Sequence, residues 1–194
     1  MAVRLMKTGE NVNLSRTDPN LMNITAGLSW DVRDTDDEEF DLDISILMVN
    51  GDGKARNDDD LIFYHNKKSR CGAIHHAGDD RKGGKKSSDN ETLHVFLNKV
   101  PQEIQKLIII VSIDEAVKRQ QHFGQVLNAY VRLVNKDSHE EIRRYNLTED
   151  GTEETAIIFG EIYRYSGDWK FKAGGVGFRG GLAEFVRSHG LQAD

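Results

Sequence analysis

The chain has 194 residues, of which 38% are hydrophobic and 30% are charged, and its formal net charge is −6 at pH 7. This composition is typical of a folded globular protein rather than a disordered chain, and the acidic balance argues against a surface that wraps nucleic acid. The single cysteine excludes an internal disulfide, and no apolar stretch reaches the roughly 18 residues of a membrane-spanning helix.

Apolar and polar residues alternate with a period of two along most of the chain, which is typical of strands with one buried face. Ten strands are expected, in chain order at residues 12–17, 23–30, 40–49, 60–65, 92–97, 106–113, 128–134, 140–147, 155–165 and 169–173. Two helices are predicted, at 114–121, which begins with acidic residues, and at 182–189, which Gly190 follows. The pattern predicts a mainly β protein, a two-sheet antiparallel β-sandwich with two short helices.

No linker rich in serine or proline interrupts this pattern. We therefore expect one domain over residues 1–194. Because the first residues contain no apolar segment of the secretory type, we also expect a cytoplasmic location.

The acidic charge is concentrated in one segment. Residues 31–60 contain 12 acidic and 3 basic residues, whereas residues 67–86 contain 7 basic and 2 acidic ones. A block of like charge is usually a solvated surface or a tail, but this block also contains a strongly apolar strand pattern. Packed carboxylates repel one another, so a bound cation or the basic segment that follows is expected to neutralise them.

Asp41 and Asp43 lie on one face of the strand predicted at 40–49, because side chains alternate along a strand, and Ser45 shares that face. The two aspartates are then ~7 Å apart, which lets both carboxylates reach one ion. Asp31, at the end of the preceding strand, can reach the same place. Calcium prefers about six to eight oxygen ligands, so these residues form a candidate calcium site. The alternative is a solvated strand edge that its charges protect from aggregation.

A second segment rich in oxygen ligands and glycine runs from Asp79 and Asp80 to Asp89, Asn90 and Glu91. Between these two groups, the basic residues and glycines form a loop. These five residues are further candidates for metal ligands.

Cys71, His75 and His76 form a separate cluster whose spacing could bind a soft metal ion. No fourth ligand is evident, and paired histidines in a polar loop are usually exposed. The cluster is therefore a weaker alternative metal site.

Seven segments in the same order resemble the TerD family of bacterial tellurite-resistance and stress-response proteins. They are GLSWDVR at 27–33, FDLDISILMVNGDGKARNDDDLIFYHN at 40–66, HAGDDRKG at 76–83, FGQVLNAYVRLVN at 123–135, RYNLTED at 144–150, ETAIIFGEIYR at 154–164 and WKFKAGGVGFRGGL at 169–182. The resemblance extends over essentially the whole chain.

The resemblance implies a calcium-binding β-sandwich without enzymatic activity. Its ligand positions correspond to Asp31, Asp41, Asp43, Asp79 and Asp80, with Asp89, Asn90 and Glu91 as further candidates. It also implies association with other proteins of a resistance system at the inner face of the membrane.

The loop between Asp80 and Asp89 departs from the family pattern. Its usual acidic centre is replaced by a stretch that contains Lys85 and Lys86, so carboxylates are lost and ammonium groups appear. A lysine ammonium could stand in for a second cation, which predicts fewer than two tightly bound calcium ions. The alternative function is an interaction module with a partly decayed metal site, whose basic loop contacts a protein or an anionic membrane surface.

Overall fold

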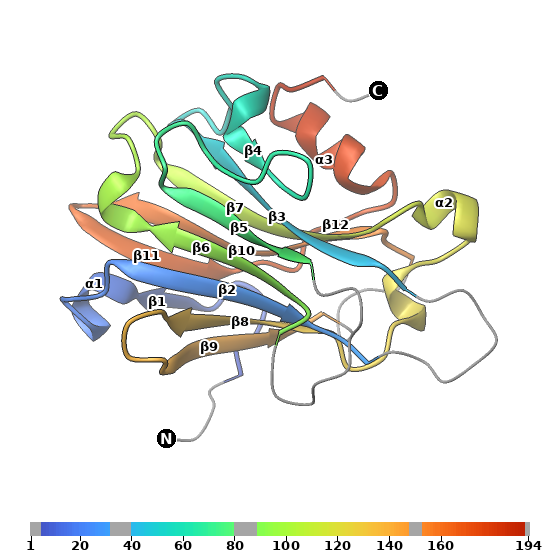
Figure 1. The fold of residues 1–194 in the computed structure, drawn as a ribbon, viewed down its shortest axis with the longest axis horizontal. Helices are drawn as coiled ribbons and strands as arrows, with labels where there is room; N and C mark the ends of the chain where they lie inside the picture. The colour runs from blue at the N-terminus through green and yellow to red at the C-terminus, as the bar shows by residue number, and fades with distance from the viewer. Residues whose placement is uncertain (1–4, 32–39, 80–88, 148–152, 193–194) are drawn as a thin grey trace.

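Two antiparallel sheets form the framework of the protein (Figure 1). The computed structural model describes residues 5–31, 40–79, 89–147 and 153–192. One sheet has the strand order β1-β11-β10-β7-β3-β4, and β12 pairs with the start of β10. Its strands are β1 (Asn11–Asn13), β3 (Leu42–Val49), β4 (Leu61–Ile62), β7 (Lys106–Ile113), β10 (Ala156–Tyr165), β11 (Asp168–Ala173) and β12 (Gly177–Phe178).

The second sheet has five strands in the order β5-β6-β2-β8-β9. They are β2 (Asn23–Ser29), β5 (Ile74–Asp79), β6 (Glu91–Phe96), β8 (Tyr130–Asn135) and β9 (Glu141–Asn146). In β6 the residues alternate strictly between buried and half-buried, as the period of two predicts. The predicted fold class is therefore confirmed.

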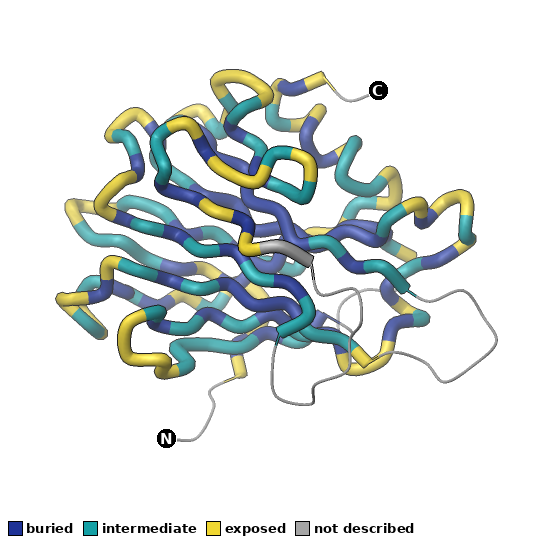
Figure 2. The backbone as a smooth tube through the Cα atoms, in the orientation of Figure 1, coloured by how far each residue is buried: buried dark blue, intermediate teal, exposed yellow. Residues whose placement is uncertain are grey.

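Buried residues fill the space between the sheets, and Figure 2 shows them along the central strands. In β3, Leu42, Ile44 and Ile46 belong to this main core, whereas Leu47 and Val49 belong to a second apolar cluster on the opposite face. Helix α3 (Gly181–Ser188) covers that face with Phe185 and Val186. The polar face of β3 thus becomes apolar where α3 begins to cover it.

The helix predicted at 182–189 is confirmed within one residue as α3, whereas the one predicted at 114–121 is shorter, and further short helices are present. The α-helices are α1 (Leu14–Thr17), α2 (Ala116–Arg119) and α3, and the 3₁₀ helices are η1 (Asp58–Asp60), η2 (Leu97–Lys99) and η3 (Phe123–Gln125). The strand predicted at 12–17 is wrong in its second half, because Asn13 Oδ1 accepts a hydrogen bond from Arg16 N at 3.0 Å and starts α1.

Two strands also differ from the prediction. The strand predicted at 60–65 is reduced to β4, because Asn66 Nδ2 donates to Leu61 O at 2.7 Å and the chain turns away. Strand β5 was not predicted, since its adjacent histidines and its glycine obscure the alternation. Strand β5 lies at the edge of the five-stranded sheet, where it pairs with β6.

Candidate metal centre

Strands from both sheets meet at one end of the sandwich. The register pairs Glu91, at the start of β6, with Leu28 near the end of β2 and with Asp79 at the end of β5. A hydrogen bond from Ile44 N of β3 to Glu91 Oε2 connects the other sheet to this end. This end of the sandwich lies on the right in Figure 1. We call it the acidic end, defined by the candidate residues Asp31, Asp41, Asp43, Asp79, Asp89, Asn90 and Glu91. Asp80, the eighth candidate, lies outside the described residues, as do Lys85 and Lys86.

Asp31, Asp41 and Asp43 come from the end of β2 and the start of β3. Asp31 is exposed, and its Oδ2 accepts a hydrogen bond from Asn128 Nδ2 at 2.6 Å. Asp41 and Asp43 are half-buried, and the carbonyl of Asp41 accepts a hydrogen bond from Asp114 N at 2.9 Å. These contacts fix the backbone and orient Asp31 toward the solvent side of the acidic end.

The oxygen donors on this face suit a hard cation. Asp43 and Ser45 share the face of β3 that points away from the main core, because Leu47 and Val49 on the same face pack under α3. Ser45 is fully buried, and its Oγ has no hydrogen-bond partner among the described residues. Carboxylate oxygens and a buried hydroxyl oxygen are donors that calcium uses, so these residue types fit this ion.

Asp89 is already paired with a cation of the protein. Its two carboxylate oxygens accept hydrogen bonds from Arg132 Nε at 2.8 Å and Arg132 Nη2 at 3.1 Å. The hydrogen bond with Asp89 is the main reason that the pKa of Arg132 is raised. The carboxylate lies over Gly27, where a Cβ would come within 2.1 Å of Asp89 Oδ2. Asp89 thus serves as a partner of Arg132, a role that the sequence analysis did not anticipate.

Glu91 points into the sandwich instead. It is 2% exposed, and its Oε2 accepts the hydrogen bond from Ile44 N at 2.6 Å. Its Oε1 lies 3.7 Å from Nε2 of His76, which is also buried. The carboxylate of Glu91 therefore joins the two sheets at the acidic end.

Asn90 and Asp79 complete the described part of the acidic end. Asn90 N donates to Leu28 O at 2.8 Å, and its side-chain Oδ1 accepts from Trp30 N at 3.4 Å. Asp79 is the last residue of β5 and lies opposite Glu91 in the register. Among the described residues, no three acidic, histidine or cysteine side chains already surround one point. An ion would have to draw the carboxylates of Asp31, Asp41 and Asp43 toward one another.

Cys71, His75 and His76, the weaker alternative metal site, do not lie together. In β5, His75 is exposed on the outer face of the sheet and His76 is buried on the inner face, because neighbouring residues of a strand point in opposite directions. Cys71 is half-buried, and its Sγ lies 3.5 Å from Ser69 Oγ. The weaker alternative, in which these three residues share one metal ion, is therefore not supported by the described geometry.

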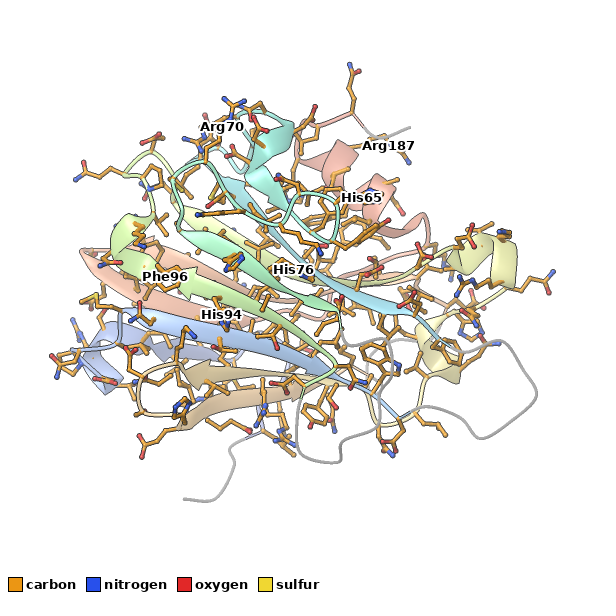
Figure 3. The ribbon with its side chains drawn as sticks, in the orientation of Figure 1. His65, Arg70, His76, His94, Phe96 and Arg187 are labelled. Carbon is orange, nitrogen blue, oxygen red and sulfur yellow. The ribbon has the colours of Figure 1, made fainter. Side chains whose placement is uncertain are left out.

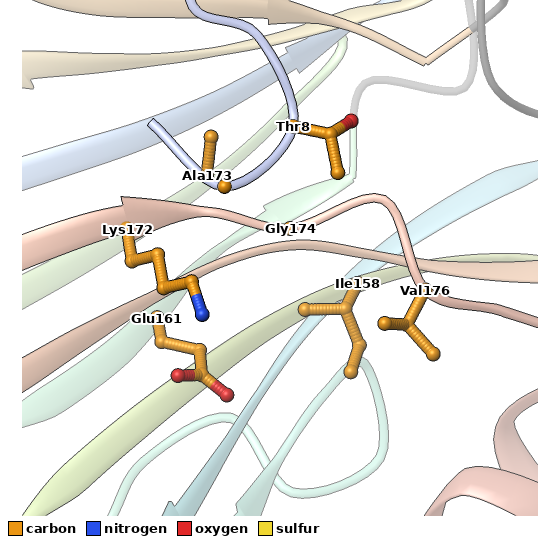
Figure 4. A pocket seen from close by; sticks show the side chains of 8 residues that line it. Thr8, Ile158, Glu161, Lys172, Ala173, Gly174 and Val176 are labelled. Atoms are coloured by element: carbon orange, nitrogen blue, oxygen red, sulfur yellow. The ribbon is translucent and has the colours of Figure 1, made fainter. Parts of the chain in front are cut away.

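A cavity of about 170 Å³ lies between the start of the chain and strands β10 and β11 (Figure 4). Thr8, Glu161 and Lys172 supply its polar side chains. The Thr8 hydroxyl lies 2.9 Å from the Tyr145 hydroxyl, and Glu161 Oε2 is paired with Lys106 Nζ at 3.0 Å. The Thr8 hydroxyl thus has the Tyr145 phenol as one partner at the edge of this cavity.

Comparison with known proteins shows similarity along the whole chain. A family model described as the TerD domain matches residues 1–189. The "Tellurium resistance protein TerD" of Alcaligenes sp is 48% identical over 193 residues, covering 100% of each chain. "General stress protein 16U" of Bacillus subtilis is 42% identical over 193 residues, covering 99% of each chain.

The fold is also similar to that of a solved structure. A homologue of telluride resistance protein (TerD) from Streptomyces coelicolor has a TM-score of 0.68 at 22% sequence identity, covering 86% of this chain and 96% of that one. Among the described residues, no helix is long and apolar enough to cross a membrane.

Proposed function

This chain belongs to the TerD family of tellurium-resistance and stress-response proteins, and we propose that it binds calcium at the acidic end and acts without catalysing a reaction. The observation that supports this proposal most is the set of oxygen donors on Asp31, Asp41, Asp43 and the buried Ser45. Calcium would bind carboxylate and hydroxyl oxygens there and offset the repulsion between the aspartates.

The bound ion would also hold the strand ends of the two sheets in one arrangement. We propose that the acidic end then serves as a docking surface for other proteins of a resistance system in the cytoplasm, at the inner face of the membrane. The relatives named for tellurium resistance and general stress support a role in such a system.

Calcium should stabilise the fold. An ion that binds only the folded state adds about 2.7 kcal/mol at a concentration of 100 Kd, which corresponds to a rise in Tm of roughly 5–10 °C for a protein of this size. Thermal unfolding of the metal-stripped protein with calcium, with magnesium and with chelator measures this effect. Identical unfolding curves in calcium and chelator would contradict the proposal.

Asp41→Asn and Asp43→Asn should each lower calcium affinity by at least about 10-fold, because each removes one charge from the ligand set while it keeps the shape of the side chain. The unfolding free energy without calcium should stay equal or rise slightly, since repulsion at the acidic end decreases. Calorimetric titration measures the affinity. Asp137→Asn is the matched control, because Asp137 follows β8 at the opposite end of the sandwich.

A second candidate is the interaction module with a partly decayed metal site. The pairing of Asp89 with Arg132 favours it, because a cation of the protein already neutralises one candidate ligand. In this case Lys85 and Lys86 would neutralise further acidic groups, and the basic loop would contact a protein or an anionic membrane. Calcium titration distinguishes the two candidate functions, since the interaction module would bind no calcium even at millimolar calcium concentrations.

A further inference from the structure

Two histidines that are distant in the sequence lie close together on the outer face of the five-stranded sheet. The antiparallel register of β5 and β6 places His75 directly opposite His94. Their ring centres are 6.5 Å apart. His75 is exposed and His94 is half-buried, whereas the neighbouring His76 and Leu93 are buried on the inner face. Two imidazoles that are 19 residues apart in the sequence therefore face the solvent as a pair.

The two rings lie on the solvent face of adjacent strands. Figure 3 labels His94 and Phe96, which are two residues apart along β6. Metal–nitrogen bonds to imidazole are about 2.0–2.1 Å long, so an ion between the rings needs ring nitrogens at most about 4 Å apart. Rings with centres 6.5 Å apart can meet this condition by side-chain rotation alone.

Thr25 orients one of the two rings. It lies opposite His94 in the register of β2 and β6, and its Oγ1 is 3.1 Å from His94 Nδ1. When the hydroxyl oxygen accepts the Nδ1 proton, the lone pair of the ring is on Nε2, where a metal ion can bind. A polar partner on the second ring nitrogen is the arrangement that orients most metal-binding histidines.

The protonation state of His94 also favours a ligand role. Burial lowers the pKa of His94, and the positive charges of Lys136 and His75 lower it further. A lowered pKa favours the neutral imidazole, which is the form that binds a metal ion. Two lysines near the pair repel a cation. They are Lys136 and the exposed Lys68, whose backbone pairs with that of His75 in an isolated β-bridge. The metal affinity should therefore be moderate and should rise with salt concentration.

We propose that His75 and His94 form a two-imidazole site for a divalent transition-metal ion such as zinc or copper. Water completes the coordination shell, since the site supplies two protein nitrogens. Imidazole nitrogen suits these ions, whereas the carboxylates of the acidic end suit calcium. The site is therefore separate in place and in ligand chemistry from the proposed calcium site.

Calorimetric titration with zinc, and separately with copper, tests the proposal on the full chain in saturating calcium. We expect one ion per chain, and copper should bind more tightly than zinc. His75→Ala and His94→Ala should each lower the affinity by more than about 10-fold. His65→Ala is the matched control, because His65 is exposed and its ring lies against Tyr64 instead. Unchanged calcium-dependent unfolding shows that each variant is folded.

The role of Thr25 has its own test. Thr25→Val should lower zinc affinity by about 10-fold, and Thr25→Ser should restore it, because serine keeps the hydroxyl. Equal zinc binding by the original protein and both histidine variants would overturn the proposal. Loss of binding in Cys71→Ser but not in His94→Ala would also overturn it, since the ligands would then be those that the sequence spacing suggested.

Discussion

Asp60→Asn should lower the free energy of unfolding by about 3 kcal/mol, because Asp60 is a buried carboxylate that accepts three hydrogen bonds from one residue. Asp60 is 1% exposed. Its oxygens accept from Arg56 N and Nε, each at 2.9 Å, and from Arg56 Nη2 at 2.6 Å. The hydrogen bond with Asp60 is the main reason that the pKa of Arg56 is raised. Urea unfolding measures the loss.

The neighbouring Asp59 provides a matched control. Its carboxylate pairs with Arg70 at 2.5 Å, but the side chains of Asp59 and Arg70 are 44% and 81% exposed. An exposed pair of this kind contributes at most ~1 kcal/mol, so Asp59→Asn should have little effect. Equal losses for Asp59→Asn and Asp60→Asn would contradict the assignment of the stability to the buried carboxylate. Calcium affinity should not change in either variant, since neither residue belongs to the acidic end.

Local patterns predict the β-sandwich because strand formation follows from alternation within a few residues. The pattern of β6 and the continuous apolar run of β7 both led to correct strands. The errors fall where one contact overrides the pattern, as at Asn13, which starts α1, and at Asn66, which ends β4. Such side-chain bonds to the backbone compete with strand pairing and leave little trace in hydrophobic periodicity.

The candidate site was predicted less completely, for a different physical reason. Oxygen-bearing side chains near strand ends identify the acidic end, but residue type does not distinguish a ligand from a structural acceptor. The partner of Asp89 is Arg132, and the partner of Glu91 is the backbone of Ile44, each on another strand. Because both contacts depend on the sheet register, the sequence alone could not separate these two carboxylates from Asp31 or Asp43.

Glu91→Ala should lower the free energy of unfolding by about 3 kcal/mol, because it removes a buried carboxyl acceptor and leaves Ile44 N without its bond. Glu91→Gln should lose less, since an amide oxygen can still accept from Ile44 N. Asp89→Asn, whose side chain is 10% exposed, provides the comparison at the same end of the sandwich. Urea unfolding of the three variants, each in calcium and in chelator, measures the changes.

The dependence of these losses on calcium decides what Glu91 does. A structural acceptor contributes equally with and without the ion, so the loss in Glu91→Ala should be the same in calcium and in chelator. A calcium ligand would instead show a larger loss in calcium, because the variant would also lose the stabilisation that ion binding adds. The bond from Ile44 N and the position of Glu91 between the sheets lead us to expect equal losses. A loss confined to calcium would place Glu91 in the ion site beside Asp41 and Asp43.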